Sequence, residues 1–366
     1  MRTALLVMGS FCACCRIWSW GRRWRPGVTW APGAAGFGTK AWRQPQPGGS
    51  SPRPGSGSRS GSEHEPFPGL LRLETLSREA LVGVLKAAVV EQRGPLVTLN
   101  KPQGLPVTGK PGELALLSVL PELSQALELG PLQVVRAPSR EASGLVLLSS
   151  CPQTASRLQK FFSHSRRTQR PTATYWAVTD GIPAATEGIV QAALRLEHTD
   201  GGHLVVPVKS PSRKDILEEV KRTLTHFRVV ASSSGCALVR LQPVTAFPHQ
   251  LQVHMVLQLC PVLGDLTYAS RVGSVLGQRF LLPAESTQPG RQVLNTALLR
   301  RLGLAPAQAA WMPLHLHLHQ LQLPGHSPRD APLELLVPLP TYFSQTLQYL
   351  GLHQPAAPPG PWEGKG

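Results

Sequence analysis

Short apolar runs recur between residues 94 and 352 and alternate irregularly with segments of helical periodicity, and this spacing constrains the fold most. Runs of this kind, rich in Val and Leu and bounded by Gly, Pro or polar residues, predict β-strands. Because the spacing lacks the regular strand–helix–strand alternation of a doubly wound sheet, we predict an α+β or mixed α/β domain. The expected strands are Leu96–Leu99, Leu145–Leu148, Tyr175–Val178, His203–Val208, Phe227–Val230, Ala237–Leu241 and Leu314–Leu323.

The segment from Ser77 to Gln92 precedes these runs and has the periodicity of a helix. Its apolar residues recur every three or four positions, so they share one face when the backbone is helical. Ser77 stands directly before this pattern, and its hydroxyl suits an N-cap. The apolar face is expected to consist of Leu81, Val84, Leu85 and Val89.

The first 62 residues contain no Asp or Glu and nine Lys or Arg residues. This composition is typical of a mitochondrial transit peptide, although the apolar stretch Ala4–Cys15 leaves a secretory signal as the alternative. The arginines that continue past that stretch favour mitochondria. From Gln44 to Ser62 the chain holds only Pro, Gly, Ser, Gln and Arg, which cannot bury enough surface to fold.

We therefore expect four regions along the chain. Residues 1–62 form a transit peptide and disordered linker that direct the protein to the mitochondrial matrix, and residues 63–93 form a helical lead-in. Residues 94–352 form the folded domain, and the Pro- and Gly-rich residues 353–366 form a flexible tail. The three cysteines that follow the leader are scattered and match neither a disulfide framework nor a metal motif.

The chain carries a formal charge of +16, of which the leader supplies nine positive residues, so the rest of the chain carries +7. Such an excess indicates an anionic partner, either nucleic acid or an anionic membrane surface. One cluster of cations lies in a stretch that has no acid between Glu141 and Asp180. If this stretch forms a helix and a following loop, the cations can contact RNA phosphates while Phe161 and Phe162 pack inward. The predicted RNA-binding residues are Arg157, Lys160, Arg166, Arg167 and Arg170.

Three histidines alternate with apolar residues within one predicted strand, at His315, His317 and His319. Alternation places them on one face of the strand, where they could be considered metal ligands. Zinc, however, usually takes paired ligands from two elements, completed by Cys or an acid, and no such residue is placed to join them. We expect a polar strand face and no metal site.

Four sequence blocks follow one another at characteristic spacing. The first three are LVTLNKPQGLPV at Leu96–Val107, RAPSREASGLVLL at Arg136–Leu148 and TYWAVTDG at Thr174–Gly181. The fourth is ALVRLQPVTAFPHQLQVHMVLQLCPVLGDLTY at Ala237–Tyr268. In this order they resemble the "NKPxGLxV", "HRLDxxTSGLLLL", "KxYxAxVxG" and "HQIRvH…GDxxY" motifs of RluA-type pseudouridine synthases. The resemblance extends over about residues 94–352.

This resemblance implies the pseudouridine synthase fold, a mixed and largely antiparallel sheet with flanking helices and a central basic cleft. It also implies that uridine in RNA is isomerised to pseudouridine without a metal or an organic cofactor. By position, Tyr175 matches the tyrosine that stacks on the target uracil, and Gly144, His249 and Gln252 match substrate-binding positions. Ser139 stands where the family carries its catalytic aspartate.

Two charged groups of the family site are missing from this sequence. Ser139 replaces the aspartate that starts cleavage of the glycosidic bond, and Gln252 replaces the arginine that pairs with it. A serine hydroxyl needs a neighbouring base before it can act as a nucleophile. Glu141 would share the face of Ser139 on an extended segment, but it would be displaced by roughly 7 Å. Ser139 and Gln252 are instead expected to satisfy each other as neutral hydrogen-bonding groups.

Two functions remain open from the sequence. In the first, the protein isomerises uridine in mitochondrial mRNA or rRNA. In the second, it is a catalytically impaired pseudoenzyme that binds RNA and supports rRNA stability and assembly of the mitochondrial ribosome. Both imply mitochondrial RNA as the partner, and the second also implies RNA-processing or ribosome-assembly proteins.

Overall fold

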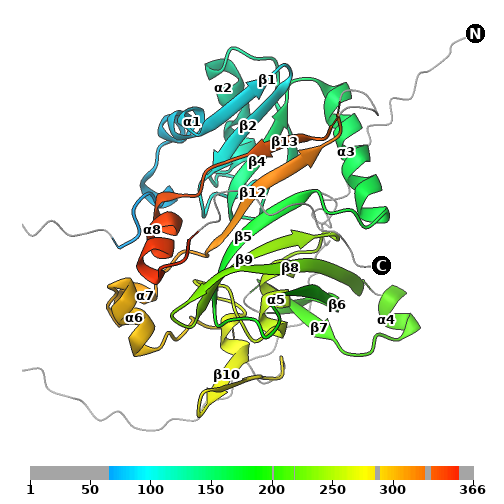
Figure 1. Ribbon diagram of the computed structural model, residues 1–366. Coiled ribbons are helices and arrows are strands. Elements are labelled where there is room, and N and C mark those ends of the chain that lie inside the picture. The colour runs from blue at the N-terminus through cyan, green and yellow to red at the C-terminus, as the bar shows by residue number, and fades with distance from the viewer. Residues whose placement is uncertain (1–65, 200–201, 218, 285–288, 326–330, 354–366) are drawn as a thin grey trace, which may run out of the picture. The chain divides into compact units, whose positions relative to one another are not determined.

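The computed structural model describes residues 66–199, 202–217, 219–284, 289–325 and 331–353. The transit peptide and linker expected at residues 1–62, and all but the first residue of the expected tail, lie outside these ranges. The described residues form an 11-stranded sheet with helices on both faces, together with a two-stranded hairpin (Figure 1). Within them, no helix is both long and apolar enough to cross a membrane.

The strands of the large sheet follow the order β1-β2-β4-β12-β5-β9-β8-β6-β7, while β3 also pairs with β4 and β13 with β12. Their pairing is antiparallel except between β4 and β12, which run parallel. The prediction of a mixed, largely antiparallel sheet is therefore confirmed. The strands are β1 (Val89–Arg93), β2 (Leu96–Lys101), β3 (Gln133–Arg136), β4 (Ser143–Ser149), β5 (Ala173–Asp180), β6 (Glu187–Thr199), β7 (Gly202–Val208), β8 (Lys221–Ser233), β9 (Cys236–Pro243), β12 (Leu316–Leu323) and β13 (Leu333–Leu336).

Eight α-helices and two short 3-10 helices surround the sheet in the described ranges, and β10 (Val272–Val275) pairs with β11 (Gln278–Leu281) apart from it. The 3-10 helices are Leu73–Thr75 and Ala269–Arg271. The α-helices are α1 (Arg78–Ala87), α2 (Leu116–Ala126), α3 (Pro152–Arg167), α4 (Arg213–Leu217), α5 (Gln250–Leu257), α6 (Thr296–Leu302), α7 (Pro306–Ala309) and α8 (Thr341–Leu350).

Strand β4 is buried along its whole length because helices cover both of its faces. Its odd-numbered residues Leu145 and Leu147 belong to the core that includes residues of α3 and α5. The even-numbered Val146 and Leu148 belong to the core under α1 and α2. Strand alternation thus explains why the sequence of β4 is an uninterrupted apolar run.

Strand β5 is also covered on both faces. Tyr175 and Ala177 face the core of α3 and α5, whereas Trp176 and Val178 face a second core built with α6 and α8. Figure 1 shows α3 and α8 on opposite sides of the central strands. The site described below lies on the Tyr175 face.

The helix predicted from Ser77 is confirmed, but its predicted end is wrong. The Ser77 hydroxyl accepts a hydrogen bond from the backbone N–H of Ala80 at 3.1 Å, so Ser77 is the N-cap. The helix ends at Ala87, and Val89 begins β1, which pairs antiparallel with β2. The β-branched pair at Val89 and Val90 suits a strand, and pairing with β2 overrides the helical pattern.

Candidate active site

The site begins where β4, β12 and β5 lie side by side. Gly144 is in register with Leu318, and Leu318 is in register with Tyr175. Gly144 has a φ of +116°, and a Cβ atom there would lie 2.3 Å from the carbonyl oxygen of Leu318. Only glycine permits this approach of the two backbones. The predicted residues Gly144 and Tyr175 are therefore brought to the two sides of one strand.

The loop of residues 137–142 connects β3 to β4 and is held mainly through its backbone. The carbonyl oxygen of Arg140 accepts hydrogen bonds from the backbone N–H of Gly104 at 2.9 Å and from Nζ of Lys101 at 3.3 Å. The Arg140 guanidinium turns away to the carboxylate of Glu113 at 3.0 Å. Ser139, the predicted catalytic position, is exposed and makes no hydrogen bond within the described residues.

Lys101 is the buried anchor of this loop. Its side chain is 0% exposed, and Nζ also donates to the carbonyl oxygens of Leu105 at 2.8 Å and Pro102 at 3.1 Å. Burial lowers the pKa of Lys101 to about 7, while the charge of Glu141 acts to raise it. Lys101 lies within the first motif block, but the sequence alone did not indicate its contact with the second.

Glu141 does not lie on an extended segment, because the chain bends at Arg140 and Glu141. Its carboxylate is partly buried and makes no hydrogen bond or ion pair in the described part of the chain. Its charge nonetheless acts to raise the pKa of three groups besides Lys101: His249, Asp265 and Tyr268. The loop thus directs a negative charge toward the fourth motif block.

The predicted residue His249 begins the opposite wall of the site. It precedes α5 with a left-handed φ of 49°, and its Nδ1 lies 2.6 Å from the hydroxyl of Tyr268. That hydroxyl accepts from the backbone N–H of Val205 at 3.1 Å, so its own proton is available to His249. Burial lowers the pKa of His249, which favours the neutral imidazole.

Gln252 and Asp265 lie deeper in this wall and are 4% and 1% exposed. Oδ1 of Asp265 accepts from the backbone N–H groups of Thr267 at 2.9 Å and Tyr268 at 3.0 Å. Burial raises the pKa of Asp265 to about 6, although a hydrogen bond from Gln252 acts to lower it. The other oxygen, Oδ2, is buried without a hydrogen-bond partner among the described residues.

This arrangement corrects the expected pairing of Ser139 with Gln252. Gln252 is buried beside Asp265, whereas Ser139 is exposed, and no hydrogen bond joins them in the described chain. Asp265 lies in the same motif block as Gln252, but the sequence did not predict it as the partner of that amide. Its position in the GDLTY segment was the available signal.

Tyr175, predicted to stack on the target uracil, is 9% exposed. Burial raises the pKa of its hydroxyl, and the positive charge of Arg136 acts to lower it. The Arg136 guanidinium lies over the ring of Phe162, 5.5 Å from its centroid. Tyr175 and Leu251 belong to one core, to which β5 and α5 both contribute. The stacking role of Tyr175 stays a prediction.

The three histidines near β12 do not form the polar strand face that we expected, because His315 and His317 are fully buried. His315 contacts the carbonyl oxygen of Pro313 at 2.8 Å and the hydroxyl of Thr346 at 2.9 Å. Burial lowers the pKa of His315 to about 4 and that of His317 to about 3. The described ranges contain no group of three His, Cys or acidic residues placed to hold a metal ion.

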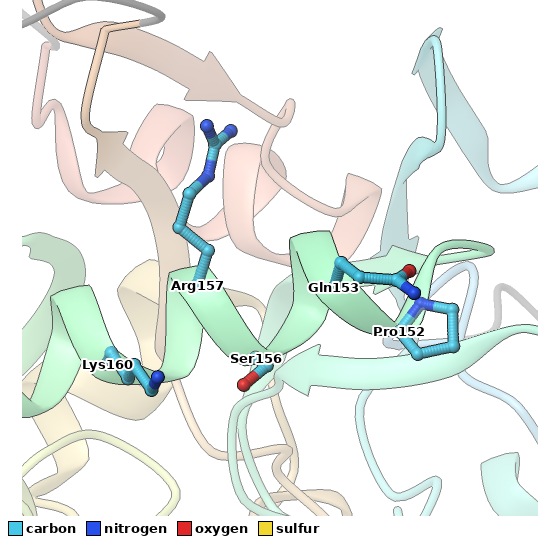
Figure 2. Close-up of a pocket in the computed structure, with 5 residues that line it drawn as sticks. All are labelled: Pro152, Gln153, Ser156, Arg157 and Lys160. Atoms are coloured by element: carbon cyan, nitrogen blue, oxygen red, sulfur yellow. The ribbon is translucent and has the colours of Figure 1, made fainter.

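The predicted RNA-binding cations share α3 and the turn that follows it. Arg157, Lys160, Arg167 and Arg170 are exposed, while Arg166 is partly buried and donates to the Ser163 hydroxyl at 3.1 Å. The apolar side of α3 packs inward as expected, with Phe162 3% exposed. A shallow hollow lies on the solvent side of the helix, where Figure 2 shows Arg157 extending away from the backbone. Its lining residues are Pro152, Gln153, Ser156, Arg157 and Lys160.

Comparison with known proteins supports one family. Residues 95–256 match the RNA pseudouridylate synthase family. The chain is 72% identical over 323 residues to mitochondrial mRNA pseudouridine synthase RPUSD3 of Bos taurus, covering 87% of this chain and 92% of the relative. It is 69% identical over 339 residues to the Homo sapiens protein of that name, covering 92% and 95%.

A more distant relative and a solved structure agree with these matches. The chain is 33% identical over 300 residues to mitochondrial pseudouridylate synthase RPUSD4 of Bos taurus, covering 78% of this chain and 74% of the relative. The structure of human RNA pseudouridylate synthase domain containing 4 superposes with a TM-score of 0.60 at 30% identity. It covers 76% of this chain and 98% of that structure.

Proposed function

Since this chain belongs to the RNA pseudouridylate synthase family, we propose that it isomerises uridine to pseudouridine in mitochondrial mRNA or rRNA. The RPUSD3 relatives carry mitochondrial mRNA in their names, which supports the choice of substrate. The observation that carries the proposal is the meeting of three motif blocks at one site. Gly144 and Tyr175 flank Leu318, and the charge of Glu141 reaches His249.

We also propose that α3 contacts the RNA backbone. Its exposed cations lie on one helix and its turn, in a stretch without acids, and their side chains extend into solvent where phosphates can approach. In this proposal the transit peptide at residues 1–62 directs the protein to the mitochondrial matrix. A fusion of residues 1–62 to a fluorescent protein should accumulate inside mitochondria, and a cytosolic or secreted fusion would contradict this.

Release of tritium tests the activity, because the hydrogen on C5 of uridine is lost when C5 bonds to the sugar. Mitochondrial RNA labelled with [5-³H]uridine is incubated with the full purified chain, and tritiated water is measured. We expect release that grows with enzyme concentration and stops when target uridines are exhausted. Absence of release from any mitochondrial RNA would contradict isomerase activity.

The pseudoenzyme remains the second candidate, favoured by the exposed serine at position 139 and the absence of an arginine at position 252. It predicts tight binding of mitochondrial RNA without tritium release. RNA affinity measured on the same samples therefore separates the two candidates. A protein that neither releases tritium nor binds RNA would contradict both.

Changing Arg157, Lys160 and Arg167 together to Ala tests the α3 contact. With single-stranded RNA, the slope of log K against log salt should become shallower by about 0.7 for each phosphate that the variant no longer neutralises. The matched control changes exposed Arg72, Lys86 and Arg300 to Ala, which removes the same charge from other surfaces. Equal loss of affinity in both triple variants would show that net charge, and not α3, governs binding.

A further inference from the structure

We propose that Glu141 is the catalytic carboxylate of this site, acting in place of the serine at position 139. The inference rests on the isomerase activity proposed above and names the residue that would perform it. A catalytic carboxylate must have an oxygen free to approach the ribose and must be held in place by the protein. Glu141 meets each of these requirements.

The backbone on both sides of Glu141 is fixed. On one side the Arg140 carbonyl is clamped by Gly104 and by the buried Lys101. On the other side Ala142 is buried, and the Ser143 hydroxyl lies 2.9 Å from Nδ1 of His317. Because anchors lie one and two residues away, the position of the Glu141 Cα is set by the fold and does not depend on its own side chain.

The carboxylate of Glu141 is not engaged by another side chain or by the backbone in the described part of the chain. Within the described residues it has no hydrogen bond and no ion pair, and the neighbouring guanidinium of Arg140 is engaged by Glu113. Because Glu141 is only partly buried, water can reach its carboxylate, and no protein group would have to be displaced within the described residues. Such a group is available to a substrate.

Neighbouring acids are less suited to this role. Asp265 is 1% exposed and uses Oδ1 for two backbone N–H groups, so a ribose could not reach it without opening the wall. Glu113 is paired with Arg140, and Asp180 is paired with Arg279 at 2.6 Å. Glu141 is partly exposed and has no ion pair within the described ranges.

Glu141 interacts electrostatically with the clamp of the loop and with the α5 wall. Its charge acts on Lys101 of the clamp and on His249, Asp265 and Tyr268 of the α5 wall. Lys101 lies on β2, whereas the other three groups lie beside α5 or in the segment that follows it, so the charge of Glu141 acts on both sides of the site. Tyr175 lies on β5, on the opposite side of Leu318 from Gly144, and a uracil ring could stack on it.

The proposed step conserves all atoms. A Glu141 oxygen bonds to C1′ of the ribose as the N1–C1′ bond breaks, and the bonding pair leaves with the uracil anion. The uracil rotates, C5 bonds to C1′, and the ester to Glu141 breaks, which restores the carboxylate. The proton on C5 passes to solvent and N1 is protonated, so the product is an isomer and no oxidant or reductant is consumed.

Glu141→Gln tests the assignment, because it keeps the size of the side chain and removes its charge. With full-length protein and mitochondrial RNA labelled with [5-³H]uridine, tritium release should fall at least 100-fold. The matched control, Glu74→Gln, makes the same chemical change at an exposed position and should stay within twofold of wild type. RNA affinity and the thermal unfolding midpoint of Glu141→Gln should match those of wild type.

If Glu141→Gln fails to fold, Glu141→Asp is the second variant. It keeps the carboxylate but shortens the side chain by one methylene. Displacing a reacting atom by about 1 Å can cost roughly 100-fold, so its release rate should fall clearly below that of wild type. Full wild-type turnover in Glu141→Asp would overturn the assignment.

Three further outcomes would overturn it. Turnover by Glu141→Gln above a tenth of wild type removes Glu141 from the mechanism but leaves the isomerase activity in place. Loss of turnover in Ser139→Ala alone would return the role to the serine. A wild-type protein that binds RNA and never releases tritium would remove this assignment and the isomerase activity together.

Discussion

The two walls of the site are built in opposite ways. The wall from His249 to Tyr268 is made of buried and partly buried side chains that bond to each other, such as partly buried His249 with buried Tyr268. The loop of residues 137–142 is held by its backbone, through the Arg140 carbonyl, while Ser139 is exposed. The first wall matches the family motif at most positions and the loop departs from it. A segment positioned by its backbone can change its side chains without losing its place.

The strongest test of this contrast is Gly144→Ala, because the backbone contact that positions the loop depends on that glycine. A Cβ atom would lie 2.3 Å from the Leu318 carbonyl oxygen in a strained left-handed region. We expect the free energy of unfolding to fall by about 3 kcal/mol or more, or the protein to be insoluble. Urea unfolding monitored by circular dichroism measures the change.

Gly83→Ala is the matched control for that substitution. Gly83 lies within α1, and nothing lies within 4 Å of a Cβ atom built there. Alanine should stabilise the helix by about 0.5–1 kcal/mol. If Gly144→Ala proves as stable as Gly83→Ala, the close approach of β4 and β12 does not fix the loop.

The side-chain wall is tested by Tyr268→Phe. This change removes the hydroxyl that contacts Nδ1 of His249 and accepts from the backbone N–H of Val205, leaving both groups without that partner. A buried group left unsatisfied costs about 1–3 kcal/mol, and we expect a loss of stability in that range. Urea unfolding provides the value. A loss below about 0.5 kcal/mol would mean that packing, and not this bond, holds the wall.

Asp265 makes the stability of the wall depend on pH. Its folded-state pKa is raised to about 6 from an ordinary 3.8, so between these values the folded protein holds a proton that the unfolded chain has lost. The contribution of Asp265 to stability therefore falls as the pH rises from about 4 to about 6. Glu141, Gln252 and the backbone N–H groups of Thr267 and Tyr268 are the groups that act on this carboxyl.

Asp265→Asn should remove that dependence. The difference in free energy of unfolding, wild type minus variant, is expected to be smaller at about pH 7.5 than at about pH 4.5. Other titrating groups, such as His254 and His315, are present in both proteins and cancel in the difference. A difference that stays constant over this range would show that Asp265 is charged in the folded protein at both pH values.

The sequence predicted those strands whose side chains are apolar on both faces or alternate clearly, such as β4 and β5. It did not indicate β6, whose residues Glu187–Thr199 are rich in helix-forming Ala, Leu, Glu and Arg. This segment is a strand because it pairs with β8 on one side and β7 on the other. Such pairing is tertiary context, which local propensity does not contain.

The site also depends on tertiary contacts that the sequence did not predict. Motif order predicted that Gly144 and Tyr175 line one pocket, and the structure places them on β4 and β5, with β12 between the two strands. The partners of Gln252 could not be inferred, since they depend on how α5 packs against the segment that contains Asp265. The position of Glu141 depended on a bend of the loop, which spacing along an extended chain could not predict.

The smallest expected effect is that of Ser139→Ala, compared with Ser143→Ala in the strand that follows the loop. Ser139 is exposed and has no hydrogen bond in the described chain, so its loss should change the free energy of unfolding by no more than about 0.5 kcal/mol. The hydroxyl of Ser143 is fully buried and contacts Nδ1 of His317 at 2.9 Å, so its loss should cost about 1–3 kcal/mol. Urea unfolding of the two variants at neutral pH compares them directly. Equal costs would mean that the Ser139 side chain stabilises the fold as much as that of Ser143 does. The loop, like the wall, would then be held in place by side chains.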